Sequence, residues 1–281
     1  MSSSSARDGS RMKIAVCWKW VSLDREHEFD ERWAGVSAAD EAALEVALAV
    51  RDSVGGETEI VVLGLGPADA DDVLRSAAAA GATTARRIDA STELDSSTVA
   101  RALAGQLSDV DLVLCGDYSI DRGTGSVPAF IAAELGIAQA LGLVEVETAA
   151  PDAPAMRVVR RLDGGRREVL DVALPAVLSV EGSVARLRRA PLTAALTART
   201  APLDVITGPH GRPADSEIHP YRPRPRTLPA PAGDTLSRVR AILDVGGAEG
   251  HAETVTLEPG AAAHRILEQL HEWGYLGEPA P

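Results

Sequence analysis

The chain has 281 residues, of which 25% are charged and 45% hydrophobic, so it is long enough for one large globular domain or two smaller ones. Its formal net charge of −13 argues against general binding to nucleic acids, because neutralising phosphates requires a surplus of Lys and Arg. Aromatic residues make up only 3% of the chain, and the aliphatic core that this implies suits helices packed on a parallel sheet.

The N-terminal residues and the cysteines narrow the class of protein further. Residues 1–11 (MSSSSARDGSR) lack the apolar core of a signal peptide, so we expect a disordered tail on a cytoplasmic protein. No apolar run is as long as a membrane span. Cys17 and Cys115 each lie in an apolar run, which favours small buried side chains over a disulfide or a zinc site.

Strands and helices are predicted to alternate over the first half of the chain. Apolar runs predict strands at 13–21, 59–65, 82–89 and 112–115. Amphipathic stretches predict helices at 37–52, 67–80 and 96–107. This alternation indicates an α/β fold with right-handed crossovers and a parallel sheet. In such sheets ligands bind beyond the carboxyl ends of the strands, where the strand order reverses.

The stretch 111–128 (DLVLCGDYSIDRGTGSVP) is a candidate anion site. A short buried strand leads through a polar loop with glycines to a helix that starts near Val127. Backbone N–H groups of such a loop and the helix dipole favour a phosphate at that place. The loop has neither the GxxxxGK[ST] nor the GxGxxG pattern. The alternative interpretation is a solvated turn that caps the helix.

The second half of the chain has a different pattern. Alternating residues at 143–148, 156–162 and 168–172, with a turn at 163–165, predict an antiparallel extension of the sheet, and a further apolar run follows at 176–180. Prolines and arginines dominate 201–231, which predicts an extended arm without a core. Helices predicted at 235–245 and 261–273 cannot form a core of their own, which suggests docking onto a partner subunit.

Five motifs in order resemble the beta subunit of electron transfer flavoprotein. They are KIAVCWKWV, SAADEAALEVALAVRD, GLGPADADDVLRSAAAAGAT, DLVLCGDYSIDRGTGSVPAFIAAELG and RRLDGGRREVLDVALPAVLSV. The resemblance covers roughly 13–199, with a weaker match in the final helix. It implies an adenine-nucleotide alpha-hydrolase-like (Rossmann-like) domain over 12–200, with a recognition loop at about 184–199 and an arm from 201 to 281 that docks on an alpha subunit.

The resemblance also implies a function. Such a beta subunit forms a heterodimer with an alpha subunit that makes most of the FAD contacts, and its own site holds AMP or, in electron-bifurcating members, a second FAD. The pair passes electrons from dehydrogenases to a quinone reductase or another acceptor. It carries out no substrate chemistry of its own, so no catalytic residue and no metal ligand are expected.

The family's functional positions map onto this chain residue by residue. The implied nucleotide-binding residues are Cys17, Ser37, Ala38, Ala39, Asp40, Leu65, Gly116, Ser119, Asp121, Arg122, Gly123, Thr124, Gly125 and Ser126. The implied docking residues for partner dehydrogenases are Leu192, Arg188 and Arg189. For the loop, Gly125 is expected to allow close approach of backbone to phosphate, and Arg122 to add a charged contact.

Two departures from the family pattern point to a specialised branch, of which the mycofactocin-associated branch is one possibility. An aromatic residue near the flavin is replaced by Ala39, and an acidic residue before the LDGG turn is replaced by Arg161. The interface with an alpha subunit is therefore expected to differ from the common one.

Two other functions share the predicted architecture. A stand-alone adenine-nucleotide-binding module of the universal-stress type binds ATP through a glycine loop, but it needs neither the C-terminal arm nor the LDGG hairpin. An ATP-pyrophosphatase-like enzyme is disfavoured, because the SGGxDS loop expected after the first strand is absent.

Overall fold

The computed structural model of the chain describes residues 12–22, 34–54, 58–147, 155–210, 233–243, 255–273 and 275. The chain divides into two compact units, Met1–Glu217 and Ile218–Pro281, which we describe separately. The tail predicted for 1–11 and most of the proline-rich segment, 211–232, lie outside the described residues.

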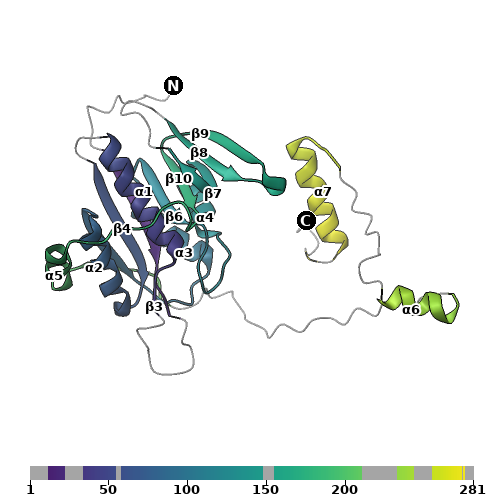
Figure 1. The fold of residues 1–281 in the computed structure, drawn as a ribbon, viewed down its shortest axis with the longest axis horizontal. Coiled ribbons are helices and arrows are strands. Elements are labelled where there is room, and N and C mark those ends of the chain that lie inside the picture. Colours follow the sequence, from purple (N-terminus) through teal and green to yellow (C-terminus); the bar gives the residue numbers. More distant parts are fainter. Residues whose placement is uncertain are drawn as a thin grey trace, which may run out of the picture. The chain divides into compact units, whose positions relative to one another are not determined.

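The first unit is built on one mixed, mostly parallel sheet (Figure 1). The strand order is β11-β5-β4-β1-β6-β10-β7-β8-β9. The strands are β1 (Lys13–Lys19), β4 (Glu59–Gly66), β5 (Thr84–Asp89), β6 (Leu112–Gly116), β7 (Ala138–Val146), β8 (Ala155–Arg161), β9 (Arg167–Ala173), β10 (Ala176–Val180) and β11 (Asp204–Thr207). Among the described strands of this sheet, only the β7–β8 and β8–β9 pairs are antiparallel.

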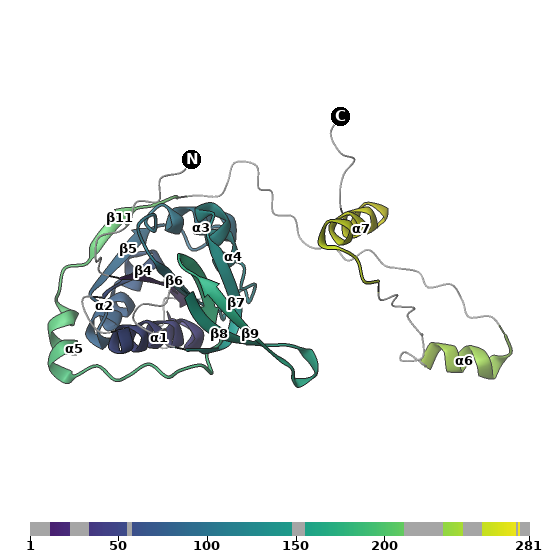
Figure 2. The same ribbon diagram turned by 90° about the horizontal axis from the view of Figure 1, so that it is seen from above.

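Helices cover both faces of the sheet (Figure 2). On one face lie α1 (Ala38–Val54) and α2 (Asp71–Ala80), and on the other lie α3 (Ser96–Ala104) and α4 (Val127–Leu135). Side chains alternate along β1, so that Val16 belongs to the core under α1 while Cys17 belongs to the core on the opposite face. The predicted α/β fold is thus confirmed, and both cysteines are buried and free, as predicted.

The strand order reverses at β1. Strands β4 and β5 follow it on one side, and β6 returns to pair with its other side. The carboxyl ends of β1 and β6 therefore flank the switch point at which ligands of such sheets bind.

The structure corrects three details of the predicted elements. The first strand ends at Lys19, and the next residues form a separate ladder between β2 (Val21–Ser22) and β3 (Ala34–Gly35). Strand β10 is not part of an antiparallel extension, since it runs parallel between β6 and β7. The first part of the expected arm holds β11, which pairs with β5 at the edge of the sheet.

The antiparallel hairpin of β8 and β9 has the predicted turn. Gly164 and Gly165 have φ of 70° and 73°, a left-handed conformation that glycine adopts without strain. Ion pairs across the hairpin join Arg157 to Asp171 and Arg160 to Glu168, which face each other in register.

The second unit contains α6 (Thr235–Leu243) and α7 (Pro259–Glu272). Several large apolar side chains of α7 and its flanks are exposed, among them Ile266, Leu267 and Trp273. Trp273 packs its ring edge-on against Tyr275, with 6.4 Å between ring centroids. Over the described part of the chain, no helix has both the length and the apolar character needed to cross a membrane.

Candidate functional site

A buried carboxylate joins three elements at the switch point. The backbone N–H groups of Lys19 and Gly116, at the ends of β1 and β6, donate to the Asp40 carboxylate over 3.4 and 3.3 Å. Asp40 itself lies in the first turn of α1, where its N–H donates to Ser37 Oγ (3.0 Å) and its carbonyl accepts from Trp18 Nε1 (2.6 Å). Asp40 thus holds the start of α1 against both strand ends.

This arrangement requires glycine at the end of β6. A Cβ at Gly116 would lie 2.7 Å from Asp40 Oδ1 and 2.9 Å from Asp40 N, which is closer than van der Waals contact allows. Burial raises the pKa of Asp40 to about 7, although its hydrogen bonds from Ser37, Lys19 and Gly116 act in the opposite direction. Near neutral pH the carboxyl is therefore partly protonated, and it repels a nearby anion less than an ordinary aspartate would.

The loop 117–126 is tied to β1 by an ion pair. Lys19 Nζ lies 2.6 and 2.7 Å from the two carboxylate oxygens of Asp121, and it donates to Ser119 Oγ over 3.2 Å. Burial raises the pKa of Asp121, but the hydrogen bonds from Lys19 and Ser119 outweigh this and lower the pKa to about 2. Lys19 is not among the predicted site residues, and its only signal in the sequence is a cation at the end of a buried strand.

Arg122 lies in the same loop, but its guanidinium is engaged elsewhere. It donates to the carbonyl oxygens of Leu94 (2.6 Å) and Thr92 (3.2 Å), in the segment that follows β5. Arg122 was expected to add a charged contact to a ligand. In the structure these bonds fix the loop to the segment after β5, and the contact with a ligand stays a prediction.

The glycines of the loop allow a backbone conformation that side chains would block. Gly123 and Gly125 have φ of 65° and 57°, and a Cβ at Gly125 would lie 2.2 Å from the carbonyl oxygen of Asp117. Thr124 Oγ1 and Ser126 Oγ are 3.1 Å apart, and the Ser126 side chain does not cap α4. The backbone N–H groups of Val127 and Ala129 in the first turn of α4, where Pro128 has none, and the one hydroxyl hydrogen that the Thr124–Ser126 bond leaves free are therefore donors that suit a phosphate.

Asp117 provides a further polar atom that the sequence analysis did not select. Its Oδ1 is buried and has no hydrogen-bond partner, and burial together with the charge of Glu181 raises the pKa of this carboxyl. Because a buried acceptor without a partner is costly, this oxygen suits an N–H or O–H group of a ligand. A nucleoside offers such groups on its base and its ribose.

The other predicted nucleotide residues lie along the same edge. Leu65 is the register partner of Lys19 on β4, and Cys17 is the register partner of Cys115 on β6. The side chains of Cys17 and Ala39 belong to the buried core. Ala38, one residue earlier, is exposed. The structure brings the predicted residues together at one edge of the sheet.

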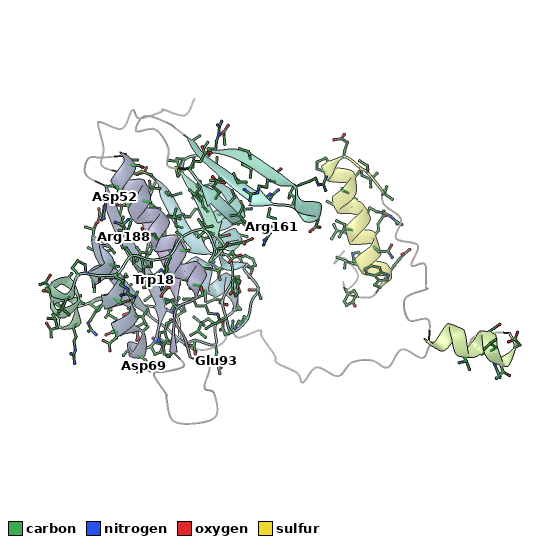
Figure 3. The ribbon with its side chains drawn as sticks, viewed as in Figure 1. Trp18, Asp52, Asp69, Glu93, Arg161 and Arg188 are labelled. Atoms are coloured by element: carbon green, nitrogen blue, oxygen red, sulfur yellow. The ribbon has the colours of Figure 1, made fainter. Side chains whose placement is uncertain are left out.

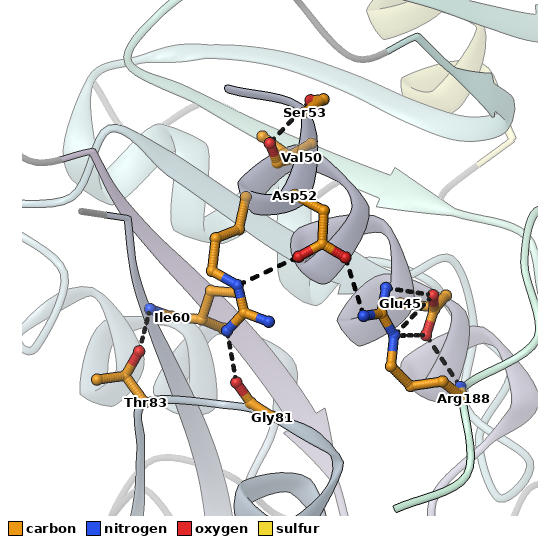
Figure 4. A network of polar contacts seen from close by, with 9 residues as sticks. Glu45, Val50, Asp52, Ser53, Ile60, Gly81, Thr83 and Arg188 are labelled. Carbon is orange, nitrogen blue, oxygen red and sulfur yellow. Dashed lines mark hydrogen bonds and ion pairs between the residues drawn. The ribbon is translucent and has the colours of Figure 1, made fainter. Parts of the chain in front are cut away.

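The predicted docking residues lie on a segment that crosses the α1–α2 face. Leu192 is the first residue of α5 (Leu192–Arg199) and is 75% exposed, and Leu196, one turn later, is also exposed. Arg188 and Arg189 are both exposed, and Arg188 lies against α1, where it pairs with Glu45 and Asp52 (Figure 4).

Arg161, which stands before the LDGG turn where the family has an acidic residue, forms an ion pair within the chain. It lies on the β8–β9 hairpin (Figure 3), and one of its terminal nitrogens is 2.9 Å from Glu181, which follows β10. Within the described ranges, no cluster of three or more His, Cys, Asp or Glu side chains is placed to hold a metal ion.

Comparisons with known proteins show which family the chain belongs to. The family model of the electron transfer flavoprotein domain matches residues 29–209. The electron transfer flavoprotein subunit beta of Methylophilus methylotrophus is 28% identical over 211 residues, which cover 70% of this chain and 79% of that protein.

Two further relatives carry other names. Protein FixA of Azorhizobium caulinodans is 33% identical over 175 residues, covering 59% of this chain and 61% of that protein. The caffeyl-CoA reductase-Etf complex subunit CarD of Acetobacterium woodii is 32% identical over 183 residues, covering 60% of this chain and 68% of that protein.

Proposed function

The chain belongs to the electron transfer flavoprotein domain family and is of its beta-subunit type, and from this premise we propose that it forms one half of an FAD-containing heterodimer. Its partner is an alpha-type subunit that holds most of the FAD. The heterodimer takes electrons from dehydrogenases and passes them to a quinone reductase or another acceptor. This chain contributes a nucleotide site and a docking surface, and its residues make or break no substrate bond.

The observation that carries the proposal is the loop 117–126 at the switch point. It combines the close backbone approach at Gly125, the amides at the start of α4 and the unpartnered oxygen of Asp117. These donors and this acceptor suit the phosphate and the nucleoside of an adenine nucleotide. The occupant is AMP, or the AMP half of a second FAD, because both present the same groups to the loop.

Docking to dehydrogenases is assigned to α5. Its exposed Leu192 and Leu196 offer an apolar anchor, and Arg189 lies beside them. Anchors of this kind contribute most when they fill a pocket of the partner.

Co-expression tests the heterodimer. The chain, produced together with an electron transfer flavoprotein alpha subunit of the same organism, is expected to purify as a yellow complex with a flavin spectrum. Denaturing the complex should then release AMP or a second equivalent of FAD, which mass spectrometry detects. A colourless chain that binds no alpha subunit contradicts the heterodimer, and a complex that releases only one FAD and no AMP contradicts the nucleotide site.

The docking surface has its own test. A Leu192→Ala variant should reduce the rate at which a dehydrogenase reduces the heterodimer, while the flavin content stays normal. Ala194→Ser, a small change on the same helix, serves as the control. Unchanged electron transfer in Leu192→Ala would remove Leu192 from the docking surface.

A further inference from the structure

A strap of residues 181–203 carries the docking helix from the end of β10 towards β11 at the far edge of the sheet. It begins beside the candidate nucleotide site, since a Cβ at Gly182 would lie 3.1 Å from both Ala38 Cβ and Ala39 N at the start of α1. Val184, Ala185 and Leu187 then pack their partly buried side chains on the core beneath α1 and α2. The strap therefore follows α1 away from the switch point.

Arg188 fastens the strap to α1 with five hydrogen bonds to two carboxylates (Figure 4). Its backbone N–H donates to Glu45 over 2.9 Å, and Nε and Nη2 donate to the same carboxylate over 2.8 to 3.1 Å. Nη1 donates to Asp52, two helical turns further along, over 2.9 Å. Such forked geometry fixes both the position and the orientation of an arginine.

The helix α5 is also held beyond this point. It packs on α2, and its Ala198 is buried. The chain after α5 is tied by Arg75 Nε, which donates to the Ala201 carbonyl over 3.3 Å, and by the ion pair of Arg86 with Asp204 at 3.1 Å. With both ends fixed, Leu192 and Leu196 still point into solvent, with 75% and 58% of their surface exposed.

We propose that Arg188 is a positioning residue: its ion pairs with Glu45 and Asp52 hold α5 in one place, so that Leu192 and Leu196 meet the electron-transfer partner already ordered. This inference rests on the proposed docking function of α5. It replaces a steering role for Arg188, because the positive charge is already compensated: Arg51 also pairs with Asp52, at 3.6 Å, so the cluster holds two arginines and two carboxylates and has no surplus positive charge. Holding a docking segment in its bound conformation strengthens association by removing the loss of freedom on binding.

The structural half of the proposal is tested on the free full-length chain. An Arg188→Met variant is expected to exchange the backbone amide hydrogens of 184–199 at least about threefold faster than the wild type. Arg157→Met is the matched control, since it also removes an exposed arginine that pairs with a carboxylate, but on the β8–β9 hairpin. We call the ion pairs of Arg188 with Glu45 and Asp52 the latch. If residues 184–199 exchange equally fast in Arg188→Met and in the wild type, the latch does not hold the strap and the proposal is wrong.

The functional half is tested on the heterodimer with its alpha subunit. A flavin-containing dehydrogenase of the same organism, chosen because it reduces the wild-type heterodimer, serves as the electron donor. Arg188→Met should raise the apparent KM for the heterodimer about three- to tenfold, while kcat and flavin content stay at wild-type values. A fall in kcat or in flavin content with unchanged KM overturns the positioning role.

Second variants keep the test decisive if Arg188→Met folds poorly. Glu45→Gln removes the latch from the side of α1 and should reproduce the same rise in KM. Arg188→Lys keeps the charge but not the forked geometry, so an intermediate KM is expected. Charge reversal in Arg188→Glu should raise KM further, and adding Glu45→Arg should restore part of the loss. Failure of both Glu45→Gln and the reversal pair to change KM counts against the latch.

The outcomes for Leu192 and Arg188 separate the two proposals. If Leu192→Ala raises KM but Arg188→Met changes neither exchange nor KM, docking on α5 stands and the latch falls. A different result is that Arg188→Met speeds hydrogen exchange in the strap while neither variant changes KM. In that case the latch holds the strap, but α5 is not the docking surface, and Arg188 has no positioning role in docking.

Discussion

Asp40 is an ionisable group buried where three elements meet, and its environment gives it a pH signature. Its ordinary pKa is 3.8, and burial raises the pKa to about 7 in the folded chain. Between these values the folded chain binds more protons than the unfolded chain. The contribution of Asp40 to the free energy of unfolding therefore falls as the pH rises from about 4 to about 7 and is constant above that.

An Asp40→Asn variant should lack this part of the pH dependence. Urea titrations at pH 5 and pH 8, followed by tryptophan fluorescence, should show a smaller loss of stability between the two pH values than in the wild type. Asp121→Asn is the contrasting variant, because the lowered pKa of Asp121 keeps it ionised in both states across this window. A pH dependence in Asp40→Asn that equals that of the wild type contradicts the buried, titrating carboxyl.

Gly125 is the residue at which the loop depends most directly on backbone geometry. Gly125→Ala places a Cβ where only 2.2 Å separate it from the Asp117 carbonyl oxygen, at a φ of 57°. The left-handed strain alone costs about 1–2 kcal/mol, and the clash forces the loop to move as well. We expect the purified heterodimer to lose most of its bound nucleotide, as measured by mass spectrometry after denaturation.

Gly136 supplies the control for that experiment. It has a φ of 65° at the end of α4, but nothing lies within 4 Å of an added Cβ. Gly136→Ala should therefore reproduce the strain without the clash and keep its nucleotide. Equal loss of nucleotide in both variants would show that strain, and not the approach to Asp117, is responsible.

At the residue scale, local sequence pattern found only part of the site. The loop 116–126 stood out because a buried strand, a loop with three glycines and a helix start follow one another in the chain. Lys19 was not predicted, and Asp40 was predicted only through the family resemblance, because their partners Asp121 and Gly116 lie 102 and 76 residues away. Such pairings depend on the strand order, which no local pattern encodes.

Among the elements, β5 contains an arginine that is buried beneath the start of α2. Arg87 donates to the Gly66 carbonyl over 3.0 Å and to Asp71 over 2.7 Å, and it also pairs with Asp89. It thereby joins the ends of β4 and β5 to the first turn of α2. Its side chain is 7% exposed, whereas the partner carboxylates are partly exposed.

Arg87→Met should reduce the free energy of unfolding by about 2 kcal/mol, because it removes the charge-assisted hydrogen bonds of a buried guanidinium, although the Gly66 carbonyl still accepts from Ala90 N–H and Asp71 still pairs with Arg75. Arg86→Met, the neighbouring substitution, removes an ion pair whose two members are 40% and 60% exposed and should cost less than about 1 kcal/mol. Chemical denaturation of both variants measures the difference. Equal losses in the two variants would indicate that the burial of Arg87 adds nothing to its contribution to the free energy of unfolding.

The order of the elements was harder to predict than their existence. Hydrophobic periodicity located β4, β6, β9 and β10 to within one or two residues, since a buried strand leaves a clear run of apolar side chains. It could not place β10 between β6 and β7, because that apolar run is compatible with any neighbour. The strand β11 was hidden by the prolines and arginines around it.

At the scale of the whole molecule, the second unit lies outside the match to the family. The matched region ends at residue 209, whereas α6 and α7 begin at Thr235 and Pro259. The side chains of Ile266 on α7 and of Trp273, the C-cap residue that follows it, are 61% and 65% exposed. Apolar residues at this helical spacing are typical of a helix that docks into a groove of a partner.

We therefore expect the pair of substitutions Ile266→Ser and Trp273→Ser to weaken the heterodimer with the alpha subunit by tenfold or more in Kd, roughly the effect of losing one hot-spot contact. The fold of the free chain should be unchanged, because both side chains are already exposed. Glu268→Ser, on the same helix, is the control. Affinity equal to the wild type, measured by titration of the labelled alpha subunit, would contradict docking through α7.

The position of β10 has a consequence for the order of folding. Strands β6 and β7 are joined by α4 but do not touch, since the gap between them is filled by a strand that follows the whole β8–β9 hairpin in the chain. Contacts of such long sequence separation form late. During synthesis, the backbone N–H of Asp117 in the loop 117–126 therefore cannot donate its hydrogen bond to the Val180 carbonyl until residues 176–180 have been synthesised. A nascent chain that stops before β10 is expected to expose the edges of both strands and to be a target for chaperones.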